Sequence, residues 1–197
     1  MTVVAIVLAG GEGRRLGGAD KALLDLGRRT VLAHLLARLT PQVSCVAISA
    51  NGDLARFTPY GLPVLPDGDF MGQGPLAGLL AGLDWAAGQG ADVLLSVPCD
   101  TPFIPSNLVA RLVPAPSCAA SSGRTHHLVA FWPVEARGRL RLLLEQPGPR
   151  DVGKFAASLG ARTVAFSPLP WDAFLNINTP GAARRAARIA RNGEDMA

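Results

Sequence analysis

A glycine-rich segment that carries cationic side chains follows the first apolar run of the chain. The run Thr2–Ala9 has the composition of a buried strand, and Gly10–Lys21 then contains five glycines, two arginines and a terminal lysine. Glycines let backbone N–H groups approach an anion with no Cβ in the way, and cationic side chains neutralise it. Such a loop at the carboxyl end of a strand predicts a phosphate cradle, and therefore a protein that handles a nucleotide.

Polar residues also follow the later apolar runs. Asn51 and Asp67 each follow one, Asp100 comes directly after a third, and Asn176 and Asn178 end a late one. Ligands of open parallel sheets bind outside the carboxyl ends of the strands. We therefore expect these side chains to converge with the glycine-rich segment at one edge of a sheet.

Asp100 is a candidate magnesium ligand. Mg²⁺ prefers one or two protein carboxylates together with phosphate oxygens and water. A turn or capping carboxylate before Pro102 explains Asp100 equally well when the residue is taken alone. The neighbouring phosphate cradle favours the role as a metal ligand. The sequence therefore predicts that Asp100 binds Mg²⁺ beside a bound nucleotide.

Two better-known phosphate loops do not match the sequence. The opening segment has no Gly-Lys pair followed by Ser or Thr, as a Walker A loop requires. Gly148–Phe155 has the glycine and lysine spacing, but Phe155 replaces the hydroxyl residue and no strand is expected before it, so we interpret it as coincidence. The dinucleotide fingerprint fails because Leu16 stands where its third glycine belongs, which disfavours a Rossmann oxidoreductase.

The elements that must position these residues alternate along the chain. Apolar runs of strand length are separated by stretches of helical periodicity, which predicts an α/β fold with a mostly parallel sheet covered on both faces. We expect one domain over residues 1–197. The expected strands are 2–9, 43–50, 62–65, 92–97, 118–121, 128–131, 162–166 and 174–177. The expected helices are 31–39, 74–87, 106–112, 138–145, 151–159 and a last one after 179, with Thr30 and Thr179 as N-caps.

Composition narrows the class of protein. The 197 residues are 49% hydrophobic and 17% charged, with a net charge of +4, which suits a globular domain that binds small anions. A single tyrosine and the lack of aromatic–basic interleaving disfavour nucleic acid. Three widely spaced cysteines indicate buried thiols in a reducing cytoplasm, and we expect neither a zinc site nor a membrane span.

The ordered motifs resemble those of the molybdenum cofactor guanylyltransferases. Leu8–Lys21 is similar to their Leu-Ala-Gly-Gly loop with its Asp-Lys end. The resemblance continues through Gly74–Gly78, Pro98–Pro102 and Asn176–Pro180 in the family's order, over nearly the whole chain. It implies a three-layer Rossmann-like nucleotidyltransferase fold. It also implies transfer of GMP from GTP to the terminal phosphate of molybdopterin-bound molybdenum, with release of pyrophosphate.

The resemblance further implies roles for individual residues. The nucleotide would be bound by Leu8, Ala9, Gly10, Gly11, Lys21, Asn51, Asp67 and Asp100. Catalysis would depend on Arg15, Lys21 and Asp100, with Asp100 as the Mg²⁺ ligand. Molybdopterin would lie against Gly74, Gly78, Arg150, Asn176 and Asn178. Molybdenum-insertion proteins or molybdoenzyme chaperones are the further partners that it suggests.

Some features depart from the family pattern, and alternatives stay open. Leu16 replaces the usual methionine, and His127 lacks the proline that usually follows, so we do not count this histidine, expected in a loop, as catalytic. Relatives that use cytosine, or that act on sugar or isoprenoid phosphates, have a loop similar to Leu-Ala-Ala-Gly. In this chain Leu8–Gly11 reads Leu-Ala-Gly-Gly, which favours guanine. The alternatives are a molybdenum cofactor cytidylyltransferase, another nucleotidyltransferase, or a nucleotide-binding module without catalytic activity.

Overall fold

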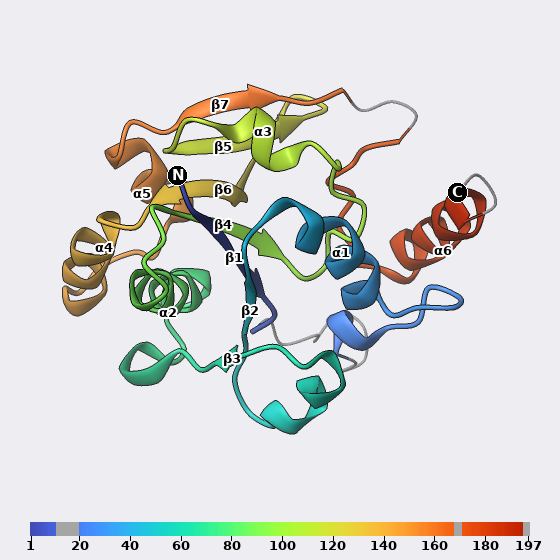
Figure 1. The fold of residues 1–197 in the computed structure, drawn as a ribbon, viewed down its shortest axis with the longest axis horizontal. Coiled ribbons are helices and arrows are strands. Elements are labelled where there is room, and N and C mark those ends of the chain that lie inside the picture. Colours follow the sequence, from blue (N-terminus) through green and yellow to red (C-terminus); the bar gives the residue numbers. More distant parts are fainter. Residues whose placement is uncertain (11–19, 168–170, 195–197) are drawn as a thin grey trace.

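In the computed structural model, which describes residues 1–10, 20–167 and 171–194, seven strands form one sheet in the order β3-β2-β1-β4-β6-β5-β7 (Figure 1). The strands are β1 (Val3–Leu8), β2 (Val46–Ser49), β3 (Val64–Leu65), β4 (Val93–Pro98), β5 (Ser117–Ser121), β6 (Arg124–Pro133) and β7 (Arg162–Ala165). The α-helices are α1 (Val31–Leu39), α2 (Pro75–Gly88), α3 (Leu108–Leu112), α4 (Ala136–Glu145), α5 (Val152–Ser158) and α6 (Pro180–Glu194). Short 3₁₀ helices include Lys21–Leu23, Leu54–Tyr60 and Gly68–Phe70.

The strand directions gather most strand ends at one edge. β1 runs parallel to β2 and β4, β2 is parallel to β3, and β5 is parallel to β7. β6 runs antiparallel to both β4 and β5. The carboxyl ends of the other strands therefore lie beside the amino end of β6. We call this the carboxyl edge of the sheet.

Helices cover both faces of the sheet, which confirms the three-layer α/β prediction. All six residues of β1 are buried, because the strand packs on both sides. Val3, Ala5 and Val7 belong to the same core cluster as Leu32, Leu35 and Leu39 of α1. Val4, Ile6 and Leu8 pack in a second cluster with Leu76, Leu79 and Leu83 of α2.

Close packing brings α2 onto the strands that carry the predicted site. A Cβ added to Gly78 would lie 2.3 Å from Ser49 Oγ, and one added to Gly82 would lie 3.0 Å from the Ile6 side chain. Glycine is therefore required at Gly78 by the distance between helix and sheet. Gly74, with φ of 74°, and Pro75 begin this helix next to the carboxyl edge.

The predicted N-caps are confirmed. Thr30 Oγ1 accepts a hydrogen bond from the Ala33 N–H at 3.1 Å, and Thr179 Oγ1 accepts one from Ala182 at 3.1 Å. α6 lies on the α1 side of the sheet, where Ala186 and Ile189 pack with Val31. Among the described helices, none is long and apolar enough to cross a membrane.

One expected strand is absent, and another is longer than expected. Residues 174–177 form no strand; instead Ile177 donates a backbone hydrogen bond to the Asp100 carbonyl at 3.0 Å and packs in the α6 cluster. The strand expected at 128–131 extends over Arg124–Pro133, so His126 and His127 lie in β6 and not in a loop. β6 pairs with β5 in a tight hairpin, and the half of β6 next to the turn is polar and partly exposed. Because this half has no apolar run, the sequence pattern did not predict it as strand.

Candidate active site

Lys21, Asp100 and Asn178 meet at the carboxyl edge of the sheet. Lys21 Nζ lies 3.6 Å from Asp100 Oδ2 and donates a hydrogen bond to Asn178 Oδ1. The three side chains come from the 3₁₀ helix Lys21–Leu23, from the turn after β4 and from the segment before α6. The backbone bond from Ile177 to the Asp100 carbonyl joins the last two segments. The structure thus brings together three residues that are far apart in the sequence, as expected.

The Asp100 carboxyl group is suited to bind a cation. Its Oδ1 atom is buried and has no hydrogen-bond partner within residues 1–10, 20–167 and 171–194. Burial raises the pKa of Asp100 above its usual value, and the positive charge of Lys21 offsets part of that rise. In the described part of the chain no three acidic, His or Cys side chains cluster as a metal site. Mg²⁺ fits such a single carboxylate when phosphate oxygens and water supply its other ligands.

Asn51 and Asp67 form a second polar pair at the same edge. Asn51 Nδ2 donates to Asp67 Oδ2 at 2.7 Å, and the Asp67 N–H donates to Asn51 Oδ1 at 3.0 Å. Ser49 Oγ donates to Asp67 Oδ1 at 3.4 Å. A Cβ added to Gly10 would lie 3.6 Å from Asn51 Nδ2, so the pair borders the start of the glycine-rich segment. Asn51 therefore orients the Asp67 carboxylate beside Gly10.

The backbone groups next to Gly10 are partly used by the sheet. The Leu8 carbonyl accepts a hydrogen bond from the Cys99 N–H at 3.0 Å, and the Ala9 N–H donates to the Ser49 carbonyl at 2.8 Å. Leu8 and Ala9 are buried, whereas Gly10 is exposed. Gly11 and Arg15, predicted to contribute to nucleotide binding and catalysis, lie outside the described residues.

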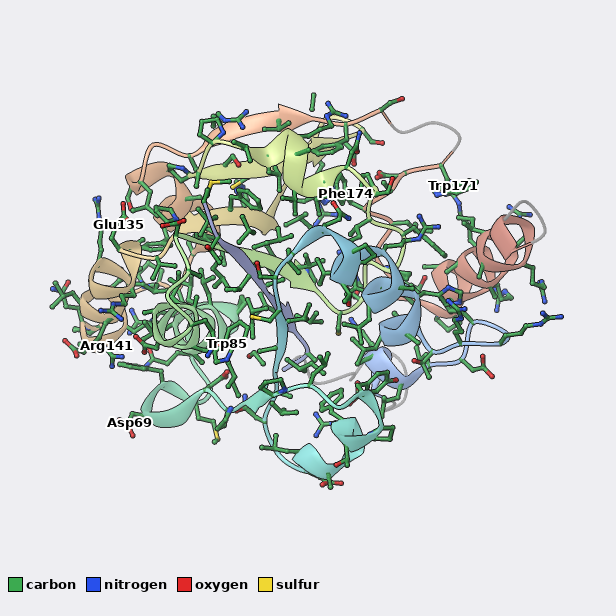
Figure 2. The ribbon with its side chains drawn as sticks, viewed as in Figure 1. Asp69, Trp85, Glu135, Arg141, Trp171 and Phe174 are labelled. Carbon is green, nitrogen blue, oxygen red and sulfur yellow. The ribbon has the colours of Figure 1, made fainter. Side chains whose placement is uncertain are left out.

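A cluster of Ser121, His126 and Asp172 holds the β5–β6 hairpin against the segment that leads to Asn178. Ser121 Oγ donates to Asp172 Oδ1 at 2.7 Å and lies 2.9 Å from His126 Nε2. Asp172 Oδ1 also accepts from the Phe174 N–H at 3.0 Å, and Phe174, labelled in Figure 2, packs against the His126 ring. Although burial opposes it, these hydrogen bonds hold the pKa of Asp172 below its usual value. No sequence motif indicated this cluster, because its members lie in two distant segments.

Arg150 lies in the segment between α4 and α5, and its side chain interacts with the protein itself. Its guanidinium donates to Gln73 Oε1 at 2.6 Å and to the carbonyls of Leu143, Leu144 and Gln146 at 2.7–3.0 Å. These bonds satisfy carbonyl groups at a helix carboxyl terminus. Arg150 also borders a cavity of about 420 Å³ between α4 and α5. These contacts give Arg150 a structural role, as the close packing of α2 does for Gly78. Contact of either residue with a pterin stays a prediction.

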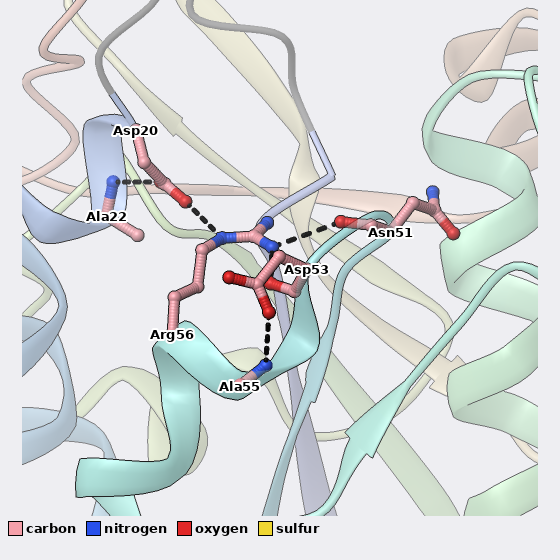
Figure 3. A network of polar contacts seen from close by, with 6 residues as sticks. All are labelled: Asp20, Ala22, Asn51, Asp53, Ala55 and Arg56. Carbon is pink, nitrogen blue, oxygen red and sulfur yellow. Dashed lines mark hydrogen bonds and ion pairs between the residues drawn. The ribbon is translucent and has the colours of Figure 1, made fainter.

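Arg56 connects two segments of the carboxyl edge and was not predicted. Figure 3 shows its guanidinium between Asp20 and the backbone of Asn51 and Asp53. Arg56 Nε lies 2.6 Å from Asp20 Oδ2, and Nη1 donates to the Asn51 carbonyl at 3.2 Å and to the Asp53 carbonyl. Sequence reasoning missed it because no motif marks an arginine whose acceptors are mostly backbone carbonyls.

Comparisons with known proteins agree on one family. The family described as the MobA-like NTP transferase domain matches residues 5–161. A molybdenum cofactor guanylyltransferase of Acidiphilium cryptum is 58% identical over 175 residues, which cover 89% of each chain. One of Rhodopseudomonas palustris is 44% identical over 195 residues, covering 94% of this chain and 93% of the relative.

Solved structures share the fold at lower sequence identity. The molybdopterin-guanine dinucleotide biosynthesis protein A of Archaeoglobus fulgidus superposes with a TM-score of 0.72 at 21% identity, covering 97% of this chain and all of the other. A nucleotidyl transferase from Methanothermobacter thermautotroptrophicus gives a TM-score of 0.75 at 18% identity, covering 98% and 99% of the two chains. At these identities the likeness concerns the fold alone.

Proposed function

This chain belongs to the molybdenum cofactor guanylyltransferases, with a MobA-like NTP transferase domain, and is a nucleotidyltransferase of molybdenum cofactor biosynthesis; we propose that it transfers GMP from GTP to the terminal phosphate of the molybdenum cofactor. The products are the guanine dinucleotide cofactor and pyrophosphate. The observation that supports this proposal is the meeting of Lys21, Asp100 and Asn178 at the carboxyl edge of the sheet.

The reaction requires positioning and charge neutralisation more than acid–base chemistry. An oxygen of the cofactor's terminal phosphate, already anionic, attacks the α-phosphorus of GTP in line. A new oxygen–phosphorus bond forms, the bond to the β-phosphate breaks, and pyrophosphate leaves without an obligatory proton transfer. Lys21 stabilises the charge that develops on the phosphate oxygens, because a fixed cation in a shielded site needs no reorganisation during the step. Arg15 would add a second cation.

Members of this family generally use a divalent metal, and Asp100 is the residue that would hold Mg²⁺ here. When bound, this ion would supply Lewis-acid polarisation of the phosphate oxygens. The buried Oδ1 atom of Asp100, without a partner among the described residues, fits this role. Lys21 lies 3.6 Å from the other oxygen of the same carboxylate, so it would bind phosphate oxygens close to Asp100.

Two groups of residues would divide the substrates between them. The backbone of Leu8, Ala9 and Gly10, together with Gly11, Asn51 and Asp67, would hold the nucleotide, since Asn51 orients Asp67 beside Gly10. Asn176 and Asn178 would contact the molybdopterin. Asn178 accepts a hydrogen bond from Lys21, which would place it next to the phosphates of the nucleotide. Gly74, Gly78 and Arg150 would shape that side, with Gly78 and Arg150 acting through the placement of α2 and α4.

The remaining expectations belong to the same proposal. Residues 1–197 would act as one nucleotidyltransferase domain in the cytoplasm. Its substrates would be GTP and molybdopterin, with molybdenum-insertion proteins or molybdoenzyme chaperones receiving the product and no nucleic acid bound. The segment after residue 161, where the family match ends, would supply Asn176 and Asn178 and would therefore be part of the active unit, which the hydrogen bond between Lys21 and Asn178 supports.

A nucleotide panel tests the proposal. The protein is incubated with the molybdopterin-bound cofactor, Mg²⁺ and GTP, CTP, ATP or UTP in turn, and pyrophosphate release and product mass are measured. We expect pyrophosphate and a guanine dinucleotide with GTP, and much slower release with the other three. Faster turnover with CTP would assign the protein to the cytidylyltransferases, and tight GTP binding without pyrophosphate would make it a binding module.

A further inference from the structure

Arg56 is held rigidly by its own element. The 3₁₀ helix Leu54–Tyr60 is capped by Asp53, whose Oδ1 accepts a hydrogen bond from the Ala55 N–H at 3.0 Å. The next residue, Phe57, is fully buried in the core, and its ring centroid lies 4.5 Å from the Arg56 guanidinium carbon. A planar guanidinium that lies over a buried ring loses less freedom when it forms hydrogen bonds than a fully mobile side chain does. The guanidinium of Arg56 is therefore held in an orientation that suits its hydrogen-bond acceptors.

The acceptors of Arg56 belong to the two halves of the nucleotide site. Asp20 directly precedes Lys21, and its two carboxylate oxygens divide their contacts between Arg56 and the Ala22 N–H at 3.0 Å, which caps the 3₁₀ helix that begins at Lys21. Asn51 offers its carbonyl to Arg56 and its side chain to Asp67. A single guanidinium thus joins the lysine segment to the segment that orients Asp67.

The ion pair between Arg56 and Asp20 is partly shielded from solvent. The side chains of Arg56 and Asp20 are 23% and 25% exposed, and their ion pair is 2.6 Å long. A charge-assisted bond of this length, backed by two carbonyl acceptors, is stronger and more directional than a surface ion pair. Lysine at this position would offer its donors from a single nitrogen without the planar fork, so it would bridge the two segments less well than arginine does.

We propose that Arg56 is a positioning residue for guanylyl transfer: through Asp20 it sets the place of Lys21 relative to Asp67, so that phosphates and base are held together. This inference rests on the proposed function. Since displacing a substrate-binding group by about 1 Å can cost on the order of 100-fold in rate, the loss of Arg56 should affect kinetics more than stability.

The chain offers a matched control in the pair Arg141–Asp84. This pair is also 2.6 Å long, and Arg141 also approaches an aromatic ring, that of Phe70. It lies between α4 and α2, and Figure 2 shows Arg141 on the side of the view opposite to α6. The pair is more exposed, at 45% and 42%, so its removal reports what a surface ion pair contributes.

The test measures kcat and KM for GTP with the full chain, for wild type, Arg56→Ala, Arg56→Lys, Asp20→Asn, the double variant Asp20→Asn/Arg56→Ala and Arg141→Ala, with the melting temperature of each. We expect Arg56→Ala to raise KM for GTP and lower kcat, for a combined loss of about 10- to 100-fold in kcat/KM. Arg56→Lys should have a kcat/KM between those of Arg56→Ala and wild type. Arg141→Ala should match wild type in both constants.

The double variant separates positioning from a general loss of fold. If Asp20 and Arg56 act as one unit, Asp20→Asn should add little to the effect of Arg56→Ala. A structural role alone would lower the melting temperature and leave KM for GTP unchanged in the folded enzyme. Unchanged kinetics of Arg56→Ala beside an active wild type would overturn the inference, whereas an inactive wild type would count against the proposed function instead.

Discussion

At the scale of the residue, Lys21 is the cation that contacts both Asp100 and Asn178, and in the proposed reaction it would join the two substrate sides. Its ammonium lies between Asp100 Oδ2 and Asn178 Oδ1, and the side chain is only 19% exposed. A lysine that served the fold alone would be expected to remain paired in the presence of nucleotide. A lysine that serves transfer must leave part of its hydrogen-bonding capacity to a phosphate oxygen.

Replacing Lys21 by alanine should therefore reduce both GTP binding and rate. We expect kcat/KM for GTP to fall by about 100-fold or more, because one fixed donor to a developing oxyanion contributes on that order. Steady-state kinetics and calorimetric titration with GTP measure the effect. Lys154→Ala is the control, since this exposed lysine belongs to the coincidental Gly-Lys spacing in α5. Equal catalytic efficiencies of Lys21→Ala and wild type would remove Lys21 from the phosphate site.

Asp100 is predicted to reduce the stability of the substrate-free protein. Burial raises its pKa, so the group favours folding while it is protonated, at pH below its unfolded value, and that contribution is lost as the pH rises through the folded pKa. Asp100→Asn should then melt at the same or a higher temperature than wild type at neutral pH, and the difference should shrink in acid. A melting temperature well below that of wild type at neutral pH would show that the carboxylate stabilises the fold.

At the scale of the element, the close approach of α2 to the sheet bears on the position of Asp67. Gly78 lets the helix approach Ser49, and Ser49 Oγ in turn donates to Asp67. The helix packs onto β1 and β2, the strands that lead to Gly10 and Asn51. A glycine in α2 thus supports the position of Asp67, a residue of the proposed nucleotide site.

Gly78→Ala should destabilise the protein. Its Cβ would lie 2.3 Å from Ser49 Oγ, so the helix or the serine must move, at a cost of about 1–3 kcal/mol in the free energy of unfolding. Gly88→Ala, in the same helix with nothing within 4 Å of the added Cβ, should be neutral or stabilising by up to about 1 kcal/mol. Chemical denaturation compares the two. If both substitutions had the same effect, the close approach of α2 would not be what requires a glycine at Gly78.

The sequence predicts elements well where burial leaves a regular pattern. Runs buried on both faces, such as β1 and β4, and the caps at Thr30 and Thr179 were predicted because each depends on local chemistry. The extent and direction of β6 were not predicted, because its polar half becomes a strand only through pairing with β5. The strand expected at residues 174–177 is absent because Leu175 and Ile177 pack in the α6 cluster, and Ile177 donates its backbone hydrogen bond to the Asp100 carbonyl and not to a neighbouring strand.

At the scale of the whole molecule, the parallel strand directions create the site. Gly10, Asn51, Asp67 and Asp100 follow the neighbouring strands β1, β2, β3 and β4, so their convergence could be predicted from strand order alone. Arg56 and the Ser121–Asp172 contact could not, because they depend on where a 3₁₀ helix and a hairpin pack in three dimensions. The net charge of +4 suits a protein that brings two polyanions together.

The transfer of labelled phosphorus tests the central claim most directly. Wild type and Asp100→Asn are incubated with the molybdopterin-bound cofactor, Mg²⁺ and GTP labelled at the α-phosphorus, and the products are separated. We predict that wild type places the label on the pterin product, while folded Asp100→Asn retains it in GTP. Label that never reaches the pterin with wild type, or that reaches it at the same rate with Asp100→Asn, would contradict guanylyl transfer at this site.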